Sequence, residues 1–201
     1  MAAILKLKAG SKISSPQVLY EGFEIGDNHI TANVGVDKIE SVMKHFVLMH
    51  DEPEFFILEL PANQKDETEI APGVVRSLHK DVYYIDGCDH EEALAILSRA
   101  GEILYNDGLI AFGFGCHESG DEIMFGKYNV LTIYSRNIDK YDDFFTKHRI
   151  ERTDKLVTAW DTFSQEYPGS SEKLTLDGES IYDLPNQFEE WGMYLAEQVE
   201  E

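Results

Sequence analysis

The chain has little cysteine, little positive charge and no long apolar segment. Its 201 residues include two cysteines, Cys88 and Cys116, which excludes a framework of several disulfides and favours a reducing, cytoplasmic setting. No apolar run approaches the roughly 20 residues that cross a bilayer. The first residues also lack the apolar core of a signal peptide. We therefore expect a cytoplasmic protein that makes no membrane contact.

Basic residues are scarce, with 17 Lys and Arg against 38 Asp and Glu and a formal net charge of −21. Because phosphate groups would be repelled, we expect neither nucleic acid nor an anionic membrane as a partner. The imbalance grows along the chain: residues 1–20 hold three lysines and no acid, whereas residues 174–201 hold eight carboxylates and no Lys or Arg. Two explanations stay open, a charge that serves solubility and an acidic surface that binds a basic protein.

The common catalytic motifs are missing. The chain has no phosphate-binding loop, no dinucleotide fingerprint and no Gly-x-Ser-x-Gly nucleophile elbow. The Gly113-Phe114-Gly115 triplet lacks the third glycine of a dinucleotide site. Small residues there instead predict a strand that a neighbouring backbone or aromatic ring approaches closely.

The segment from Asp89 to Ser135 organises the expected fold. Asp89 and Glu92 form a capping-box pattern that predicts a helix over residues 89–105, with one wide apolar face. Gly108 is expected to end this helix in the left-handed conformation. Two apolar runs, 109–115 and 123–134, then predict an antiparallel hairpin.

The rest of the chain alternates short strands with helices. Strands are expected over residues 3–8, 17–24, 29–34, 55–60, 82–85 and 155–163, with a hairpin at Asp177-Gly178. Helices are expected over 37–47, from Asn137 to His148 and from Asp183 to Val199, while 61–75 is expected to be a mobile or functional loop. We therefore predict a single α+β domain over residues 1–201, with a mainly antiparallel sheet, hairpins and about four helices packed on it.

One polar segment contains metal-ligand residue types. The five are Cys116, His117, Glu118, Asp121 and Glu122, and Cys88, Asp89 and His90 stand at the preceding helix start. Neighbouring residues on a strand point to opposite faces, however, and no Cys-x-x-Cys or His-x-x-x-His spacing is present. We therefore expect a solvated turn with no metal and no cofactor, rather than a zinc site or a thiol nucleophile activated by histidine. Whether Cys116, His117 and Glu118 converge on one site is left open.

These features favour a non-enzymatic acidic interaction protein. Its expected type is an immunity or inhibitor protein that masks a basic protein partner such as a nuclease toxin. Two alternatives stay open: a small hydrolase or metal-dependent enzyme that uses the Cys116–Glu122 turn, and a structural homo-oligomer subunit. No catalytic residue is assigned. The expected partner-binding residues are Asp66, Glu67, Glu69, Asp183, Glu189, Glu190 and Glu197.

Overall fold

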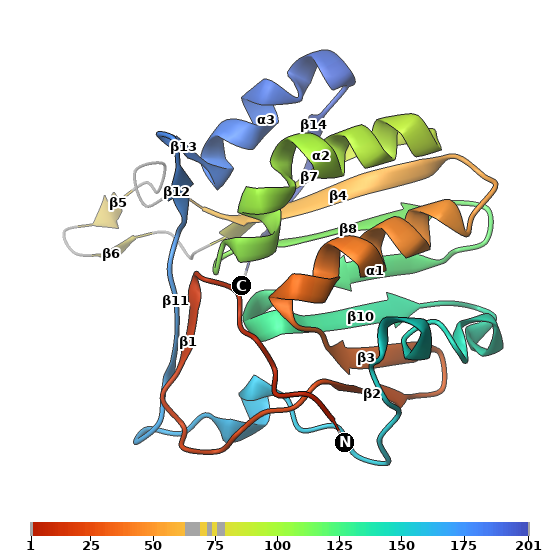
Figure 1. The fold of residues 1–201 in the computed structure, drawn as a ribbon. Helices are drawn as coiled ribbons and strands as arrows, with labels where there is room; N and C mark the ends of the chain where they lie inside the picture. The colour runs from red at the N-terminus through yellow and green to blue at the C-terminus, as the bar shows by residue number, and fades with distance from the viewer. Residues whose placement is uncertain (1, 63–68, 72–73, 76–78, 201) are drawn as a thin grey trace.

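The computed structural model describes residues 2–62, 69–71, 74–75 and 79–200, and it is built around an eight-stranded antiparallel sheet (Figure 1). The strands follow the order β14-β7-β4-β8-β9-β10-β3-β2 across the sheet. Their bounds are β2 (Gly22–Ile25), β3 (His29–Asn33), β4 (Glu54–Pro61), β7 (His79–Cys88), β8 (Ala111–Cys116), β9 (Glu122–Phe125), β10 (Val130–Tyr134) and β14 (Tyr194–Glu200). The predicted α+β class with a mainly antiparallel sheet is confirmed.

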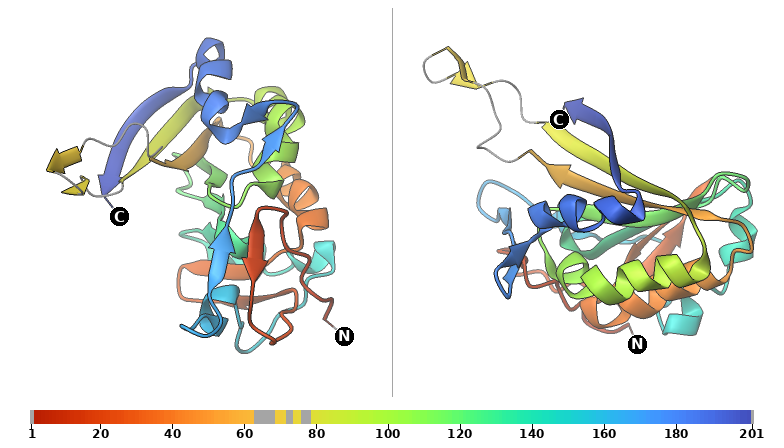
Figure 2. Two further views of the ribbon diagram at one scale, coloured as in Figure 1. Left: turned by 90° about the vertical axis from the view of Figure 1, so that its left-hand side faces the viewer. Right: turned by 90° about the horizontal axis from the view of Figure 1, so that it is seen from above.

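The helices cover one face of this sheet. They are α1 (Val36–Leu48), α2 (His90–Asn106) and α3 (Leu184–Gln187), and Figure 2 shows all three on the same side. In the part of the chain that is described, the opposite face carries no helix, and no helix is long and apolar enough to cross a membrane. Among the described residues, the α-helices therefore pack on a single face of the sheet.

Shorter elements surround the sheet. Three small pairs form: β1 (Ser11–Ile13) with β11 (Gly169–Ser171), β5 (Glu69–Ala71) with β6 (Val74–Val75), and β12 (Thr175–Leu176) with β13 (Glu179–Ser180). The 3-10 turns are η1 (Lys127–Asn129), η2 (Ile138–Tyr141), η3 (Thr146–His148), η4 (Ala159–Thr162), η5 (Ile181–Asp183) and η6 (Glu189–Trp191). The predicted Asp177-Gly178 hairpin is confirmed, since both residues take the positive φ that such a turn requires.

Helix α2 begins where the sequence predicts. The Asp89 side chain accepts a hydrogen bond from the Glu92 amide at 2.9 Å, and the Glu92 side chain accepts one from the Asp89 amide at 3.0 Å. The helix ends at Asn106, within one residue of the predicted end, but Gly108 does not take the predicted left-handed conformation. A side chain at Gly108 would place its Cβ 1.9 Å from the carbonyl oxygen of Gly10. Gly108 is therefore needed for the close approach of two chain segments.

Two further predictions are wrong near the sheet. The strand expected over 123–134 is a second hairpin, β9 and β10, whose turn places Tyr128 and Asn129 at φ 56° and 64°. The helix expected from Asp183 to Val199 stops early: α3 and η6 end at Gly192, which has φ 86°, and the chain continues as strand β14. The pairing of β8 with β9 in antiparallel order is confirmed.

The N-terminal third and residues 137–163 also differ from expectation. Residues 3–8 form only a single bridge, between Ile4 and Tyr20, and residues 155–163 contain η4 instead of a strand. Helix α1 starts after Gly35, which has no side chain to cap it, and the Asp37 carboxylate in the first turn pairs with the Lys6 ammonium. The helix expected after Asn137 is reduced to the short turns η2 and η3.

A histidine pair joins α1 to the η2–η3 segment. Nε2 of His148 lies 2.9 Å from Nδ1 of His45, and Nδ1 of His148 lies 3.2 Å from the Ser41 hydroxyl. Burial, followed by the nearby His45, Lys38 and Lys147, lowers the pKa of His148 to about 4. Burial likewise lowers the pKa of His45, with Asp143 acting in the opposite direction.

We expect this pair to make the fold sensitive to acid. Below pH 6.5 the unfolded chain protonates the imidazole of residue 148 but the folded chain does not, so stability is full above pH 6.5 and declines as the pH falls to about 4. Allowing for solvent screening of this half-buried group, the loss should be about 1–2 kcal/mol. Urea unfolding at several pH values should show a shallower decline for His148→Gln. The exposed-site control His117→Gln should follow the wild type, and equal slopes for all three proteins would contradict the assignment.

Candidate functional site: an acidic end and an aromatic ladder

One end of the sheet brings together seven acidic side chains from separate elements. The end of α1, the starts of β4 and α2, the end of β7 and the β8–β9 turn all lie there (Figure 1). Two adjoining clefts of about 380 and 420 Å³ open at this end. Their acidic lining residues, which we call the acidic end, are Asp51, Glu52, Asp86, Asp89, Glu91, Glu92 and Glu190. Among the described lining residues of both clefts, none is Lys or Arg.

The smaller cleft combines carboxylates with an aromatic wall. Ile85, Ala95 and Ile96 supply apolar surface, and Trp191, which is 41% exposed, stands beside Glu190. Guanidinium and ammonium groups bind carboxylates and also stack on the face of tryptophan, while their alkyl stems pack on apolar surface. The cleft therefore has the chemistry that suits an Arg or Lys side chain of a partner.

The larger cleft is held in shape by Glu52. Its carboxylate accepts hydrogen bonds from the backbone amides of Glu118 and Ser119 at 2.9 and 3.2 Å, which ties the α1–β4 loop to the β8–β9 turn. Burial would raise the pKa of Glu52, but these bonds and the Ser119 side chain outweigh it and lower the pKa. Glu52 therefore stays ionised at neutral pH and contributes a fixed negative charge.

An aromatic ladder runs from the acidic end across the uncovered face of the sheet. Successive ring centroids lie 6.4 Å apart for Tyr194 and Tyr84, 5.4 Å for Tyr84 and Phe55, and 4.7 Å for Phe55 and His117. Asp86 links the two ends of this ladder, because it accepts a hydrogen bond from the Tyr194 hydroxyl at 2.6 Å and lies 3.3 Å from Nε2 of His117. The same Asp86 lines the smaller cleft, so the ladder and the acidic end form one continuous surface.

Two glycines of strand β8 allow close approach, one by a ring of the ladder and one by the backbone of strand β9. A Cβ at Gly115 would lie 2.2 Å from the Phe55 ring, and one at Gly113 would lie 1.8 Å from the Ile123 carbonyl oxygen. The predicted close approach of a ring and a backbone to these two glycines is confirmed.

No protein-family model, curated protein or solved structure matches this chain. The functional assignment therefore rests on its own side chains.

The described residues among the acids predicted from the sequence lie on separate elements. Glu190 lines the smaller cleft, Glu189 precedes it on η6, and Glu197 lies on β14 opposite Val82. Asp183 is engaged elsewhere, since it accepts hydrogen bonds from the amide and hydroxyl of Ser180 at 2.7 and 3.0 Å. Glu69 begins β5, and Asp66 and Glu67 lie outside the described residues, as does most of the loop predicted over 61–75.

Most of the acidic end was missed by sequence reasoning. A local signal was present, because Asp86, Asp89, Glu91 and Glu92 fall within seven residues at the start of α2. The contributions of Asp51, Glu52 and Glu190 depend on tertiary contacts, since these residues come from two other parts of the chain.

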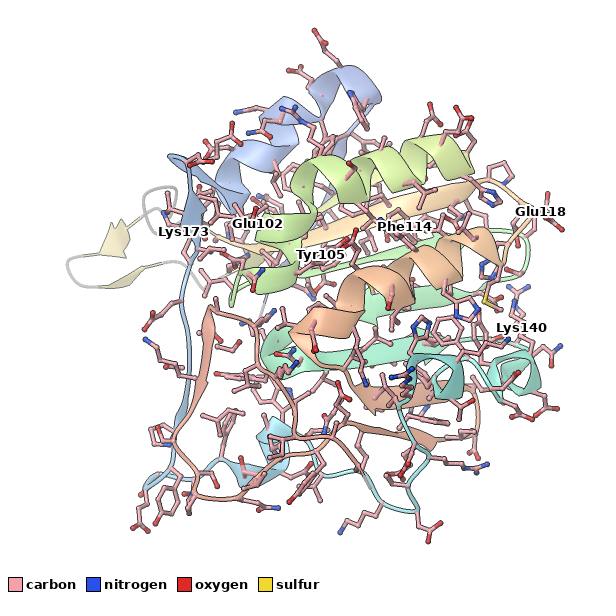
Figure 3. The ribbon with its side chains drawn as sticks, viewed as in Figure 1. Glu102, Tyr105, Phe114, Glu118, Lys140 and Lys173 are labelled. Carbon is pink, nitrogen blue, oxygen red and sulfur yellow. The ribbon has the colours of Figure 1, made fainter. Side chains whose placement is uncertain are left out.

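The polar residues predicted at the Cys116–Glu122 turn separate in the structure. His117 and Glu118 are exposed, and Figure 3 shows Glu118 at the same end of the molecule as Lys140. Cys116 and Asp121 are instead buried. There they join a group that we call the polar cluster: His50, Glu54, Cys116, Asp121, Lys140 and Tyr141. Cys116, His117 and Glu118 therefore do not converge on one site.

The thiol of the polar cluster is buried and poorly suited to catalysis. Cys116 is 1% exposed, and burial, together with the charges of Glu54 and Glu52, raises the pKa of its thiol to about 12. A protonated, inaccessible thiol is a weak nucleophile. His50 and Glu54 were missed from the sequence, because they lie at the end of a helix and the start of a strand and form no recognised motif.

Proposed function

We propose that this chain is a non-enzymatic binding protein that recognises a basic protein partner through the acidic end and the aromatic ladder. The observation that carries the proposal is the lining of the two clefts, which contains seven carboxylates and, in the described part of the chain, no Lys or Arg. A surface of this kind complements clustered Arg and Lys side chains. The formal net charge of −21 adds a long-range attraction between this chain and a positively charged partner.

The two parts of the surface act at different stages of binding. Carboxylates at the rim of an interface mainly raise the association rate, because they steer a basic protein before contact. Aromatic side chains supply contact area and slow dissociation, and Tyr and Trp are enriched among residues that dominate binding energy. Tyr194 and Trp191 are both exposed and both border Asp86 or its cleft. They are the expected anchors of the complex.

An inhibitor or immunity protein is the type that this surface fits best. Such a protein covers a basic functional surface, for example the nucleic-acid-binding site of a nuclease, and needs no chemistry of its own. The buried position of Cys116 favours this assignment over a hydrolase at the β8–β9 turn.

A pair of matched double variants tests the proposal. Glu91→Gln with Glu190→Gln removes two charges from the acidic end, and Glu166→Gln with Glu179→Gln removes two exposed charges elsewhere, so both variants carry the same net charge. Partners are captured from the source cell lysate at low salt and identified by mass spectrometry, and their association rates are then measured. We expect a basic partner whose association rate falls about tenfold for the first variant and little for the second.

Salt dependence provides the independent readout. Raising the ionic strength from about 0.1 to 1 M shortens the screening length from roughly 10 to 3 Å and should slow association of the wild type strongly. A neutral or acidic partner, salt-insensitive association, or equal effects of the two double variants would contradict the proposal. Recovery of the chain itself as the sole partner would favour the homo-oligomer alternative.

A further inference from the structure

Glu54 is a buried carboxylate without a partner. It is 1% exposed, and neither of its two carboxylate oxygens has a hydrogen-bond partner among the described residues. The only ammonium group of the polar cluster, that of Lys140, is paired with Asp121. A carboxylate buried without a hydrogen bond or counter-charge is costly, so native proteins pair it with a donor or a cation or keep it protonated. Burial, with the charge of Glu52, raises the pKa of Glu54 to about 8, and a bound cation would supply the missing partner of the ionised form.

The atoms around Glu54 are metal-ligand atoms. A nitrogen of His50, the Cys116 sulfur and a Glu54 oxygen all lie within 4.8 Å of one another, and all three residues are buried. Oε1 of Glu54 lies 3.8 Å from Nδ1 of His50. A zinc ion bonds to imidazole nitrogen and carboxylate oxygen at about 2.0–2.2 Å, so a single ion can bridge these two atoms with only small movements.

The surroundings of His50 resemble the outer shell of a metal-bound histidine. Nε2 of His50 lies 3.0 Å from the Asp121 carboxylate, which is in position to accept the second ring N–H, and Lys140 balances the charge of Asp121. Nδ1 also lies 2.9 Å from the Phe46 carbonyl oxygen. If Nδ1 binds a metal, this contact with the Phe46 carbonyl is lost, but the carbonyl still accepts a hydrogen bond from the Met49 amide.

We propose that the polar cluster binds one divalent transition-metal ion of the zinc class through His50, Glu54 and Cys116. Thiolate and imidazole together favour zinc over the hard cations magnesium and calcium, which prefer oxygen ligands. The ligands come from the α1–β4 loop, the first residue of β4 and the last residue of β8. An ion at this point cross-links the elements that carry Glu52 and the β8–β9 turn, so its role is to hold the acidic end in shape.

The test uses Zn²⁺ and Co²⁺ on the full chain. Metal content is measured on protein purified without chelator and on protein refolded with Zn²⁺. Refolding in the presence of Zn²⁺ lets the ion reach the three buried ligands before the fold closes around them. We expect one equivalent of zinc per chain and a melting temperature that rises with zinc concentration. The Co²⁺ form should show the charge-transfer absorption of a thiolate ligand. This absorption would be missing if Cys116 only packed in the core and did not bind the metal.

Two variants and two controls make the assignment specific. Cys116→Ser and the isosteric Glu54→Gln should weaken zinc binding by about a hundredfold or more, at or above the effect of losing an outer-shell partner. Glu54→Gln also keeps the size and shape of this unpaired side chain, so this variant should fold and should lose the zinc-dependent rise in melting temperature. Cys88→Ser removes the other buried cysteine and His117→Gln an exposed histidine, and both should bind zinc like the wild type. No zinc uptake by wild type after refolding, or unchanged affinity in Glu54→Gln, would overturn the proposal.

Discussion

Replacing Asn129 with Ala is expected to destabilise the fold by about 3–5 kcal/mol. The side chain is fully buried and makes three hydrogen bonds: Oδ1 accepts from the Lys8 amide at 2.8 Å, and Nδ2 donates to the carbonyls of Val34 and Lys6 at 2.8 and 3.1 Å. The Lys6 carbonyl keeps the Val36 amide as a donor at 2.9 Å, so the loss comes mainly from the Lys8 amide and the Val34 carbonyl. A buried backbone group that loses its partner costs about 1–3 kcal/mol. Asn129 also has φ 64°, which Asn tolerates better than Ala. One side chain thus joins the N-terminal segment, the end of β3 and the β9–β10 turn.

Urea unfolding measures this loss directly. Asn137→Ala is the matched control, because Asn137 is exposed and makes no side-chain cap bond, and its effect should stay within about 0.5 kcal/mol. Asn129→Gly separates the two causes, since glycine accepts the positive φ but restores none of the hydrogen bonds. It should recover no more than about 1 kcal/mol. A loss below about 1 kcal/mol for Asn129→Ala would mean that water or neighbouring groups replace these bonds.

Leu104→Ala in helix α2 is expected to cost about 2–5 kcal/mol. Leu104 is fully buried in the main core, where α2 packs on the sheet, and the substitution leaves a cavity in addition to the lost burial. Leu97, at 2% exposure, should behave in the same way. Leu94 lies on the same helix but is only partly buried, so Leu94→Ala should cost less than either.

The three leucine variants should be compared in one series of unfolding curves with equal m-values, so that a change in midpoint reports a change in stability. The ranking is as informative as the size of the effects. Losses below about 1 kcal/mol at both Leu97 and Leu104 would mean that α2 contributes little to the core. A larger loss at Leu94 than at Leu104 would contradict the packing described above.

Sequence patterns gave correct predictions of secondary structure where the interactions that decide it are local. The Asp89 and Glu92 side chains are three residues apart and form the box that starts α2, so the start could be read from spacing alone. The apolar repeat of α2 and the Asp177-Gly178 turn are local in the same sense. The sequence also predicted that an aromatic ring or a backbone would approach Gly115, although it did not predict that the ring belongs to Phe55.

The C-terminal segment shows why local patterns fail elsewhere. Phe188, Trp191, Leu195 and Val199 have helical spacing, yet Leu195 and Val199 belong to strand β14. The backbone of β14 pairs with β7, which lies over 100 residues earlier in the chain, and this pairing outweighs a weak helical preference. Gly192 allows the change of direction with its positive φ.

The sequence by itself determined the α+β class, the start of the central helix and the strong negative charge. Only the tertiary structure decided where that charge is concentrated and which polar residues meet. Asp51, Asp86 and Glu190 line adjoining clefts because the ends of separate elements meet at one end of the sheet. Glu54 and Cys116 are opposite each other because β4 and β8 pair antiparallel, and His50 joins them from the end of α1. Contacts between residues about 60 positions apart depend on strand order and register, which no local pattern encodes.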